Sequence, residues 1–140
     1  MRGLNWENAR GDCLGYGGDL VSIANQSEMS FVYNKSSKVW NQRYWIGLND
    51  RRNENQFVWS DGTPYVYSNW YSGQPNDRAG EDCVELYRTG WNDNGCKKEY
   101  GYICEKNKPK GNLELHIIHT VASWPRVQRY LVDTVGQNVF

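Results

Sequence analysis

One stretch of this chain decides how the rest is interpreted: Gln74-Pro-Asn-Asp-Arg-Ala-Gly-Glu-Asp-Cys-Val-Glu-Leu-Tyr-Arg-Thr-Gly-Trp-Asn-Asp93. It concentrates oxygen donors, namely the side chains of Gln74, Asn76, Asp77, Glu81, Asp82, Asn92 and Asp93. Ca2+ binds about 6 to 8 oxygen ligands, whereas zinc favours nitrogen and sulfur. Neither a His nor a free thiol pattern lies beside this set. The stretch therefore predicts a calcium site.

Length, composition and charge narrow the class of protein. The chain has 140 residues, of which 39% are hydrophobic, and this fits one domain with its own core. Its 16 basic residues balance its 16 acidic ones, so neither nucleic acid nor an anionic membrane is an expected partner. No apolar run approaches the ~20 residues that span a bilayer. Met1-Arg-Gly3 leads directly into a helical pattern, so we expect a natural targeting signal to lie outside these residues.

The cysteines indicate disulfides and an oxidising compartment. Neither a C-x-x-C spacing nor a neighbouring His accompanies Cys13, Cys83, Cys96 and Cys104. Zinc and thioredoxin-like sites are therefore disfavoured. Four cysteines allow three connectivities, and their spacing does not choose among them. Together with the sequons that begin at Asn25 and Asn34, the cysteines favour a secreted or extracellular protein.

The beginning of the chain predicts two helices. Apolar residues recur at helical spacing over residues 6–15, and Asn5 is the expected N-cap. A short extended segment, residues 19–23, follows this helix. Asn25 and Glu28 then form a capping-box pattern at the start of a second helix.

The periodicity then becomes strand-like, with many aromatic and β-branched residues. We expect strands near residues 44–48, 57–59, 84–86 and 100–105. The region from residue 60 to 82 combines turn residues with aromatic ones, which predicts a packed, functional loop. Roles in core or loop packing, rather than in ligand contact, are assigned to Trp45, Trp59, Trp70 and Trp91.

A series of ordered landmarks resembles the C-type lectin-like domain over residues 4–106. They are Trp6-x-x-Ala-x-x-x-Cys13, Trp45-Ile-Gly-Leu48, Gln74-Pro-Asn76, Gly80-Glu-Asp-Cys83, Trp91-Asn-Asp93, Cys96 and Ile103-Cys104. The resemblance implies one domain over residues 1–106 with an α+β fold, in which two helices and small antiparallel sheets support a long calcium-binding loop. It also implies a cis peptide bond before Pro75 and disulfides that join Cys13 to Cys104 and Cys83 to Cys96.

Carried over residue by residue, the resemblance implies two calcium sites. The sugar-binding calcium of the family would be held by Gln74, Asn76, Glu81, Asn92 and Asp93. An auxiliary calcium would be held by Asp50, Glu54, Asp77, Glu81 and Asp82. The alternative is a set of ordinary polar loop residues in a domain that has lost calcium. Such a loss usually leaves apolar or basic replacements, and none stands at these positions.

The function that the resemblance implies is a calcium-dependent carbohydrate-binding lectin module that recognises vicinal hydroxyls of glycans. The family uses Glu-Pro-Asn in mannose-type and Gln-Pro-Asp in galactose-type domains, whereas Gln74-Pro-Asn76 offers two amides. The site has one carboxylate fewer than either type, which predicts weaker calcium binding. No aromatic residue follows the triplet in Asp77-Arg-Ala-Gly80, although Tyr71 precedes it and Tyr87 and Trp91 are further candidates for an aromatic platform. Mannose- or fucose-type glycans are therefore favoured over galactose-type ones.

Two other functions are weighed against this one. The first is a protein-recognition module of the same fold in which calcium is only structural. The second is an enzyme, which is not expected, because both imidazoles of the chain, His116 and His119, lie apart from every motif.

Residues 107–140 extend beyond the resemblance. Members of the family normally carry a strand before the first helix that pairs with the final strand, and this chain starts at the helix. Leu113-Glu-Leu-His-Ile117 alternates apolar and polar residues. Residues 113–119 are therefore predicted to replace the missing strand, in the same chain or swapped into a second copy of a homo-oligomer. The segment that follows is expected to be helical or disordered. The alternative for the whole extension is a flexible tail or the beginning of a lost neighbouring domain.

Overall fold

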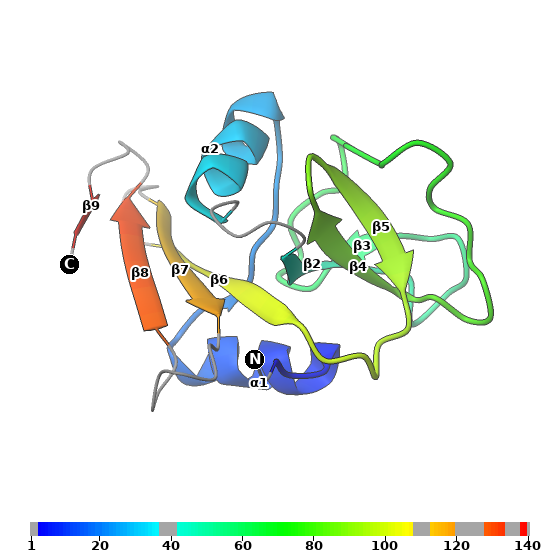
Figure 1. Ribbon diagram of the computed structural model, residues 1–140, viewed down its shortest axis with the longest axis horizontal. Helices are drawn as coiled ribbons and strands as arrows, with labels where there is room; N and C mark the ends of the chain where they lie inside the picture. The colour runs from blue at the N-terminus through cyan, green and yellow to red at the C-terminus, as the bar shows by residue number, and fades with distance from the viewer. Residues whose placement is uncertain (1–2, 37–41, 108–112, 120–127, 134–137, 140) are drawn as a thin grey trace.

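The structure is a computed structural model that describes residues 3–36, 42–107, 113–119, 128–133 and 138–139 (Figure 1). Beyond residue 106 it describes the course of the backbone and not the side chains. Within these ranges, no helix has both the length and the apolar character needed to cross a membrane.

Both predicted helices form where the sequence places their caps. α1 spans Trp6–Gly15, and the side chain of Asn5 accepts a hydrogen bond from the backbone N–H three residues on. α2 spans Gln26–Ser36, and the side chain of Asn25 accepts the N–H of Glu28 at 2.9 Å. These caps satisfy donors that the first turn of a helix leaves unpaired, so each helix begins at a defined residue.

The strands of the described residues form one sheet. They are β1 (Asp19–Leu20), β2 (Arg43–Asn49), β3 (Val58–Trp59), β4 (Cys83–Tyr87), β5 (Gly90–Asn94), β6 (Gly101–Asn107), β7 (Leu113–His119), β8 (Gln128–Asp133) and β9 (Asn138–Val139). Their order is β5-β4-β2-β6-β7-β8-β9, with β1 paired to β6 and β3 paired to β2. Two helices beside a sheet agree with the predicted α+β class. The resemblance implies small antiparallel sheets. The other strand pairs are antiparallel, but β2 and β6 run parallel, so the sheet is mixed.

β5 is a strand that the sequence pattern does not predict. It pairs antiparallel with β4 residue for residue, from Cys83 opposite Asn94 to Tyr87 opposite Gly90. Asn and Asp disfavour strands, and β5 ends in the run Asn-Asp-Asn. Pairing with β4 across a tight hairpin outweighs this local preference.

The C-terminal extension adds strands beside β6. β7 pairs antiparallel with β6, and β8 pairs antiparallel with β7. The prediction of a helical or disordered segment after residue 119 is therefore wrong for residues 128–133, because strand pairing there outweighs the helical spacing of the apolar residues. The role of residues 113–119 as a replacement for a missing N-terminal strand stays a prediction.

Alternate residues of β2 face two separate cores. Tyr44 and Ile46 lie in one cluster with residues of α2, and Trp45 lies in the other with residues of α1. Figure 1 shows the corresponding arrangement, with the two helices on opposite sides of the sheet. The second cluster contains both disulfides, which have the pairing that the resemblance implies, Cys13–Cys104 and Cys83–Cys96.

The loop between β3 and β4 packs against the core through its aromatic residues. Trp70 meets the rings of Phe57 and Trp91 edge-on, at centroid distances of 5.0 and 5.9 Å. Tyr67 meets Trp91 at 5.8 Å, and Trp59 meets it at 5.5 Å. The predicted packing roles are thus confirmed, and these contacts hold the polar part of the loop near β5.

Candidate metal centre

Asp93 of β5 anchors the polar part of the loop, residues 74–82, which we call the triplet loop. Its carboxylate is nearly inaccessible, with the residue 1% exposed. Its two oxygens accept the backbone N–H of Asn76 at 3.1 Å, and one of them accepts that of Asp77 at 2.7 Å. The Gln74–Pro75 peptide bond is cis, as the resemblance implies. The triplet and Asp93 therefore belong to one hydrogen-bonded unit.

Gln74 carries an oxygen that the described residues leave unpaired. Its Oε1 is buried and accepts no hydrogen bond from them, while its backbone N–H donates to the carbonyl of Tyr71 at 2.9 Å. A buried polar atom without a partner costs about 1–3 kcal/mol. A cation would satisfy this oxygen, and amide oxygens are ligands that Ca2+ accepts. The residues of the triplet loop therefore fit a calcium ion.

The remaining predicted ligands of the sugar-binding site lie around this unit. The backbone N–H of Glu81 donates to Asp77 Oδ1 at 3.2 Å, and Glu81 Oε2 accepts the N–H of Arg78 at 3.2 Å. Asn92 lies next to Asp93 in the sequence, and its Nδ2 donates to Glu85 Oε1 at 2.8 Å. Glu81 is thus hydrogen-bonded to Asp77 and Arg78 within the triplet loop. Asn92 is hydrogen-bonded to β4 instead.

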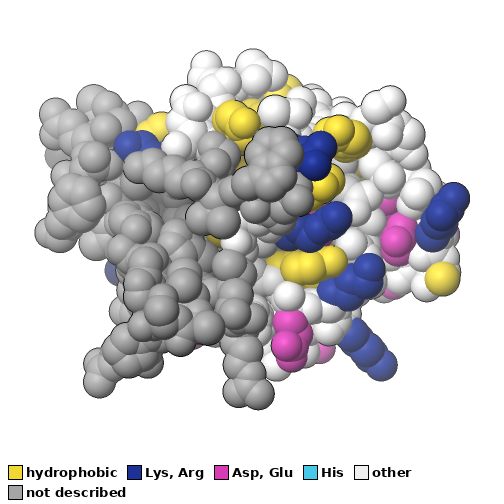
Figure 2. Space-filling model, viewed as in Figure 1, with side chains coloured by type: hydrophobic (Ala, Val, Ile, Leu, Met, Phe, Trp, Pro, Cys, Tyr) yellow, Lys and Arg dark blue, Asp and Glu magenta, His cyan; other side chains and the backbone are white. Residues whose placement is uncertain are grey.

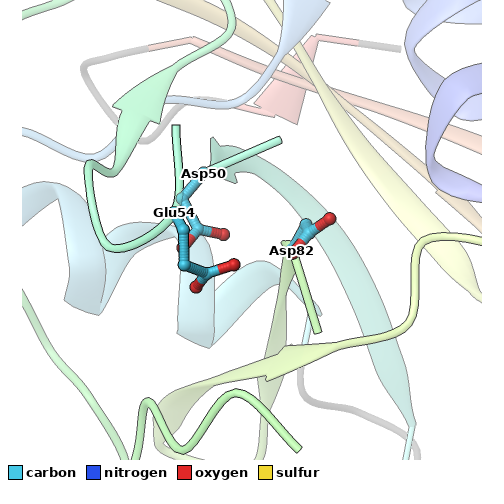
Figure 3. A group of neighbouring side chains, drawn as sticks. All are labelled: Asp50, Glu54 and Asp82. Carbon is cyan, nitrogen blue, oxygen red and sulfur yellow. The ribbon is translucent and has the colours of Figure 1, made fainter. Parts of the chain in front are cut away.

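Three of the predicted auxiliary ligands converge at the end of β2 and the start of β4. Asp50, Glu54 and Asp82 each offer a carboxylate oxygen, and these oxygens lie within 4.8 Å of one another. Figure 3 shows Asp50 and Glu54 side by side, with Asp82 facing them from the neighbouring segment. The other two predicted ligands, Asp77 and Glu81, do not belong to this group.

The electrostatics of this carboxylate group also fit a divalent cation. Asp50 is 3% exposed, and its Oδ1 is buried without a hydrogen-bond partner in the described residues. Burial raises the pKa of Asp50, and the negative charge of Asp82 raises it further. The hydrogen bond from the Asn55 backbone and the side-chain hydrogen bond with Glu54 oppose this rise. Loss of solvation raises the pKa of Glu54 as well, and the neighbouring carboxylates add to the rise. A bound divalent cation would relieve this repulsion.

Two residues beside the site have no role in the sequence analysis. Glu85 of β4 is 0% exposed and forms an ion pair with Arg43 of β2. Burial raises the pKa of Glu85, while the hydrogen bond from Asn92 and the charge of Arg43 oppose that rise. The signal that identifies Glu85 in the sequence is its place within an otherwise apolar run, Cys83-Val-Glu-Leu86.

Comparison with known proteins identifies the family to which this chain belongs. The model of the lectin C-type domain family matches residues 2–106. The chain is similar to the low affinity immunoglobulin epsilon Fc receptor of Mus musculus, with 43% identity over 104 residues that cover 72% of this chain and 30% of the receptor. This chain therefore spans less than a third of that relative's length.

Solved structures agree with this match. The cow C-type carbohydrate-recognition domain of CD23, solved in the presence of GlcNAc2Man3 oligosaccharide, has a TM-score of 0.68 and 39% identity, covering 73% of this chain and 79% of that one. A calcium-independent type II antifreeze protein has a TM-score of 0.66 and 27% identity, covering 74% of this chain and 78% of that one. On the extent of the family match, this chain belongs to the lectin C-type domain family, which includes carbohydrate-recognition domains and is not a class of enzymes.

Proposed function

We propose that this chain is a calcium-dependent lectin module that binds vicinal hydroxyls of glycans at the triplet loop and β5. The observation that carries the proposal is the buried Oε1 of Gln74, which has no hydrogen-bond partner among the described residues. It lies two residues before Asn76, whose backbone N–H donates to Asp93. The ligands of the sugar-binding calcium would be Gln74, Asn76, Glu81, Asn92 and Asp93. Those of a second, auxiliary calcium would be Asp50, Glu54, Asp77, Glu81 and Asp82.

The same side chains can serve metal and sugar together. A bound Ca2+ accepts 6 to 8 oxygens, so two neighbouring hydroxyls of a pyranose can complete its coordination. The amides of Gln74 and Asn76 can donate to a sugar hydroxyl or accept from it, and the carboxylate of Glu81 can accept. The backbone hydrogen bonds to Asp93 keep these groups in place before the sugar arrives, which lowers the entropy lost on binding.

The sugar class proposed for the site is mannose- or fucose-type. The residues that follow the triplet, 77–80, are exposed and carry no aromatic ring that could stack on the apolar face of galactose. Tyr71 precedes the triplet and is 38% exposed, but its ring lies 6.2 Å from that of Tyr87 and belongs to that pair. With two amides in the triplet, calcium and sugar affinities are expected to be modest.

The proposed setting is secreted or extracellular, with a homo-oligomer as the form that would raise the affinity for multivalent glycans. Two disulfides support an oxidising compartment. The 140 residues are charge-balanced, and nucleic acid is not among the proposed partners.

A second candidate is a protein-recognition module in which calcium only shapes the loop. Asp93 favours it, because backbone N–H groups already occupy both carboxylate oxygens and can hold the triplet loop without a metal. The structural similarity to a calcium-independent antifreeze protein also supports the protein-recognition module.

Affinity chromatography distinguishes the two candidates. The proposed lectin is retained on mannose-agarose in millimolar calcium, is eluted by EDTA, and is retained less on galactose-agarose. Glu81→Ala should abolish retention, whereas Glu99→Ala removes an exposed carboxylate outside the site and should leave it unchanged. Absence of retention on either sugar would favour the protein-recognition module.

A further inference from the structure

Glu85 is a buried carboxylate whose hydrogen bonds within the described ranges all meet at one oxygen. It lies in β4, is 0% exposed, and has no place in the proposed ligand sets. Its Oε1 accepts Asn92 Nδ2 at 2.8 Å and Asn94 Nδ2 at 3.3 Å, and it also pairs with the guanidinium of Arg43. Its Oε2 is buried and has no partner in the described residues. A carboxylate buried in this way needs a reason, because burial of a charge is costly.

The hydrogen bond from Asn92 fixes the orientation of the Asn92 amide. A carboxylate accepts hydrogen bonds and does not donate them, so the amide must turn its nitrogen towards Glu85. The reversed amide would place Oδ1 against a carboxylate oxygen, which is repulsive. Oδ1, the atom that could bind calcium, is therefore kept on the side away from Glu85.

The sheet register and Arg43 hold Glu85 itself in place. Glu85 is opposite Asn92 on one side and opposite Trp45 on the other, so one face of β2, β4 and β5 presents these residues together. Arg43 supplies the compensating charge. Its guanidinium lies 4.0 Å from the ring centre of Tyr87 and 5.9 Å from that of Tyr100, which restricts its movement. Figure 2 shows Lys and Arg side chains beside hydrophobic ones on the face that it draws.

From this geometry we infer that Glu85 is a positioning residue for Asn92, held by Arg43, which turns the Asn92 oxygen towards the sugar-binding calcium. The inference rests on the proposed function, because it takes Asn92 as a calcium ligand. Glu85 acts on the metal site through the amide and does not touch the metal. Outer partners of this kind typically change metal affinity by 10- to 100-fold when they are removed.

Calorimetric titration of the whole chain with calcium tests whether Glu85 positions Asn92. Glu85→Met removes every acceptor at similar length and should weaken calcium binding about 10-fold or more. Glu85→Gln keeps an oxygen where Oε1 lies, so it should recover most of the affinity. Asn94→Ala is the matched control, because it removes another donor to the same Oε1 without removing a proposed ligand, and calcium affinity should stay within about 2-fold of the wild type.

A double-mutant cycle separates positioning from a general structural effect. If Glu85 acts through Asn92, then Glu85→Met should cost no further calcium affinity in the Asn92→Ala background. Additive losses would overturn the role. A wild-type chain that binds no calcium would overturn the proposed function and this role with it, whereas equal affinity of the wild type and Glu85→Met would overturn this role alone.

If Glu85→Met does not fold, the inference can still be tested by NMR on the wild-type chain without calcium. In EDTA, one side-chain amide proton of Asn92 should be shifted downfield in the NMR spectrum and exchange slowly with water, because it is bonded to a buried carboxylate. An Asn92 amide that exchanges as fast as an exposed one, such as that of Asn8, would contradict the inference.

Discussion

The backbone N–H of Asp50 donates to the backbone carbonyl of Asp82 at 3.0 Å. This bond joins the end of β2 to the start of β4 and brings the two side-chain carboxylates into one group with Glu54. Because the repulsion between them is not offset without a cation, calcium should raise the melting temperature. At a concentration 100 times Kd, one site adds about 2.7 kcal/mol to the free energy of unfolding. Differential scanning calorimetry in millimolar calcium and in EDTA measures the shift.

Variants show which of the two proposed calcium sites produces the shift in melting temperature. Asn92→Ala and Asp93→Ala should each remove the part that comes from the sugar-binding site. Asp50→Asn should reduce the calcium-dependent part while leaving stability in EDTA equal or higher, because it removes one of three neighbouring charges. An identical midpoint of the wild type with and without calcium would contradict the prediction.

The charge of the triplet gives a second prediction. Gln74→Glu places a carboxylate where a buried amide oxygen has no partner in the described part of the chain. Calcium binding should therefore tighten by about 10-fold, since affinity follows the number of charged ligands. Retention on mannose-agarose should rise with it. Asn8→Asp, which adds a carboxylate on α1, is the control and should change neither value. Equal or weaker calcium binding by Gln74→Glu in calorimetry would show that this oxygen is not a ligand.

The sequence predicts those elements that local patterns specify. Asn5 and Asn25 cap helix α1 and helix α2 as predicted, because a side-chain cap acts within one turn. Local patterns do not predict β5, because its stability comes from pairing with β4 rather than from its own residues. The parallel pair of β2 and β6 escapes them too, since the direction of pairing leaves no trace in the alternation of side chains.

For the candidate site too, the sequence predicts some features and not others. Ligand types can be read from the sequence because calcium chemistry needs oxygen donors, and the resemblance adds their grouping. Which partner each donor has depends on register: Asn92 meets Glu85 because β4 and β5 pair with these two residues opposite each other. No local pattern in the sequence contains that relationship.

Glu105 of β6 gives a prediction about pH. Burial, and then the charges of Asp61 and Glu28, raise its pKa from 4.5 to about 7, against the opposing hydrogen bonds from Ser22. The folded state therefore binds this proton more tightly than the unfolded state. The resulting stability is fully present below about pH 4.5 and is lost as the pH rises through about 7.

Glu105→Gln should remove this dependence. At pH 8 the variant should be more stable than the wild type, by at most about 3 kcal/mol, and the difference should shrink towards pH 5. Urea denaturation of both proteins at pH 5 and pH 8, in EDTA to exclude metal effects, measures it. A difference that is the same at both pH values would show that Glu105 titrates normally.

The C-terminal extension gives the last prediction. β7 pairs with β6 from Asn107 back to Tyr102, so its removal would leave the backbone donors and acceptors along that side of β6 without their partners. Exposed strand edges associate readily. Truncation after Lys108 should therefore lower the melting temperature by several degrees and promote aggregation. Truncation after Asp133, which keeps β7 together with its partner β8, is the matched control and should lie close to the full chain in both measurements. A chain ending at Lys108 that stays monomeric in size-exclusion chromatography and melts at an unchanged temperature would refute the idea that residues 113–119 take the place of a missing strand.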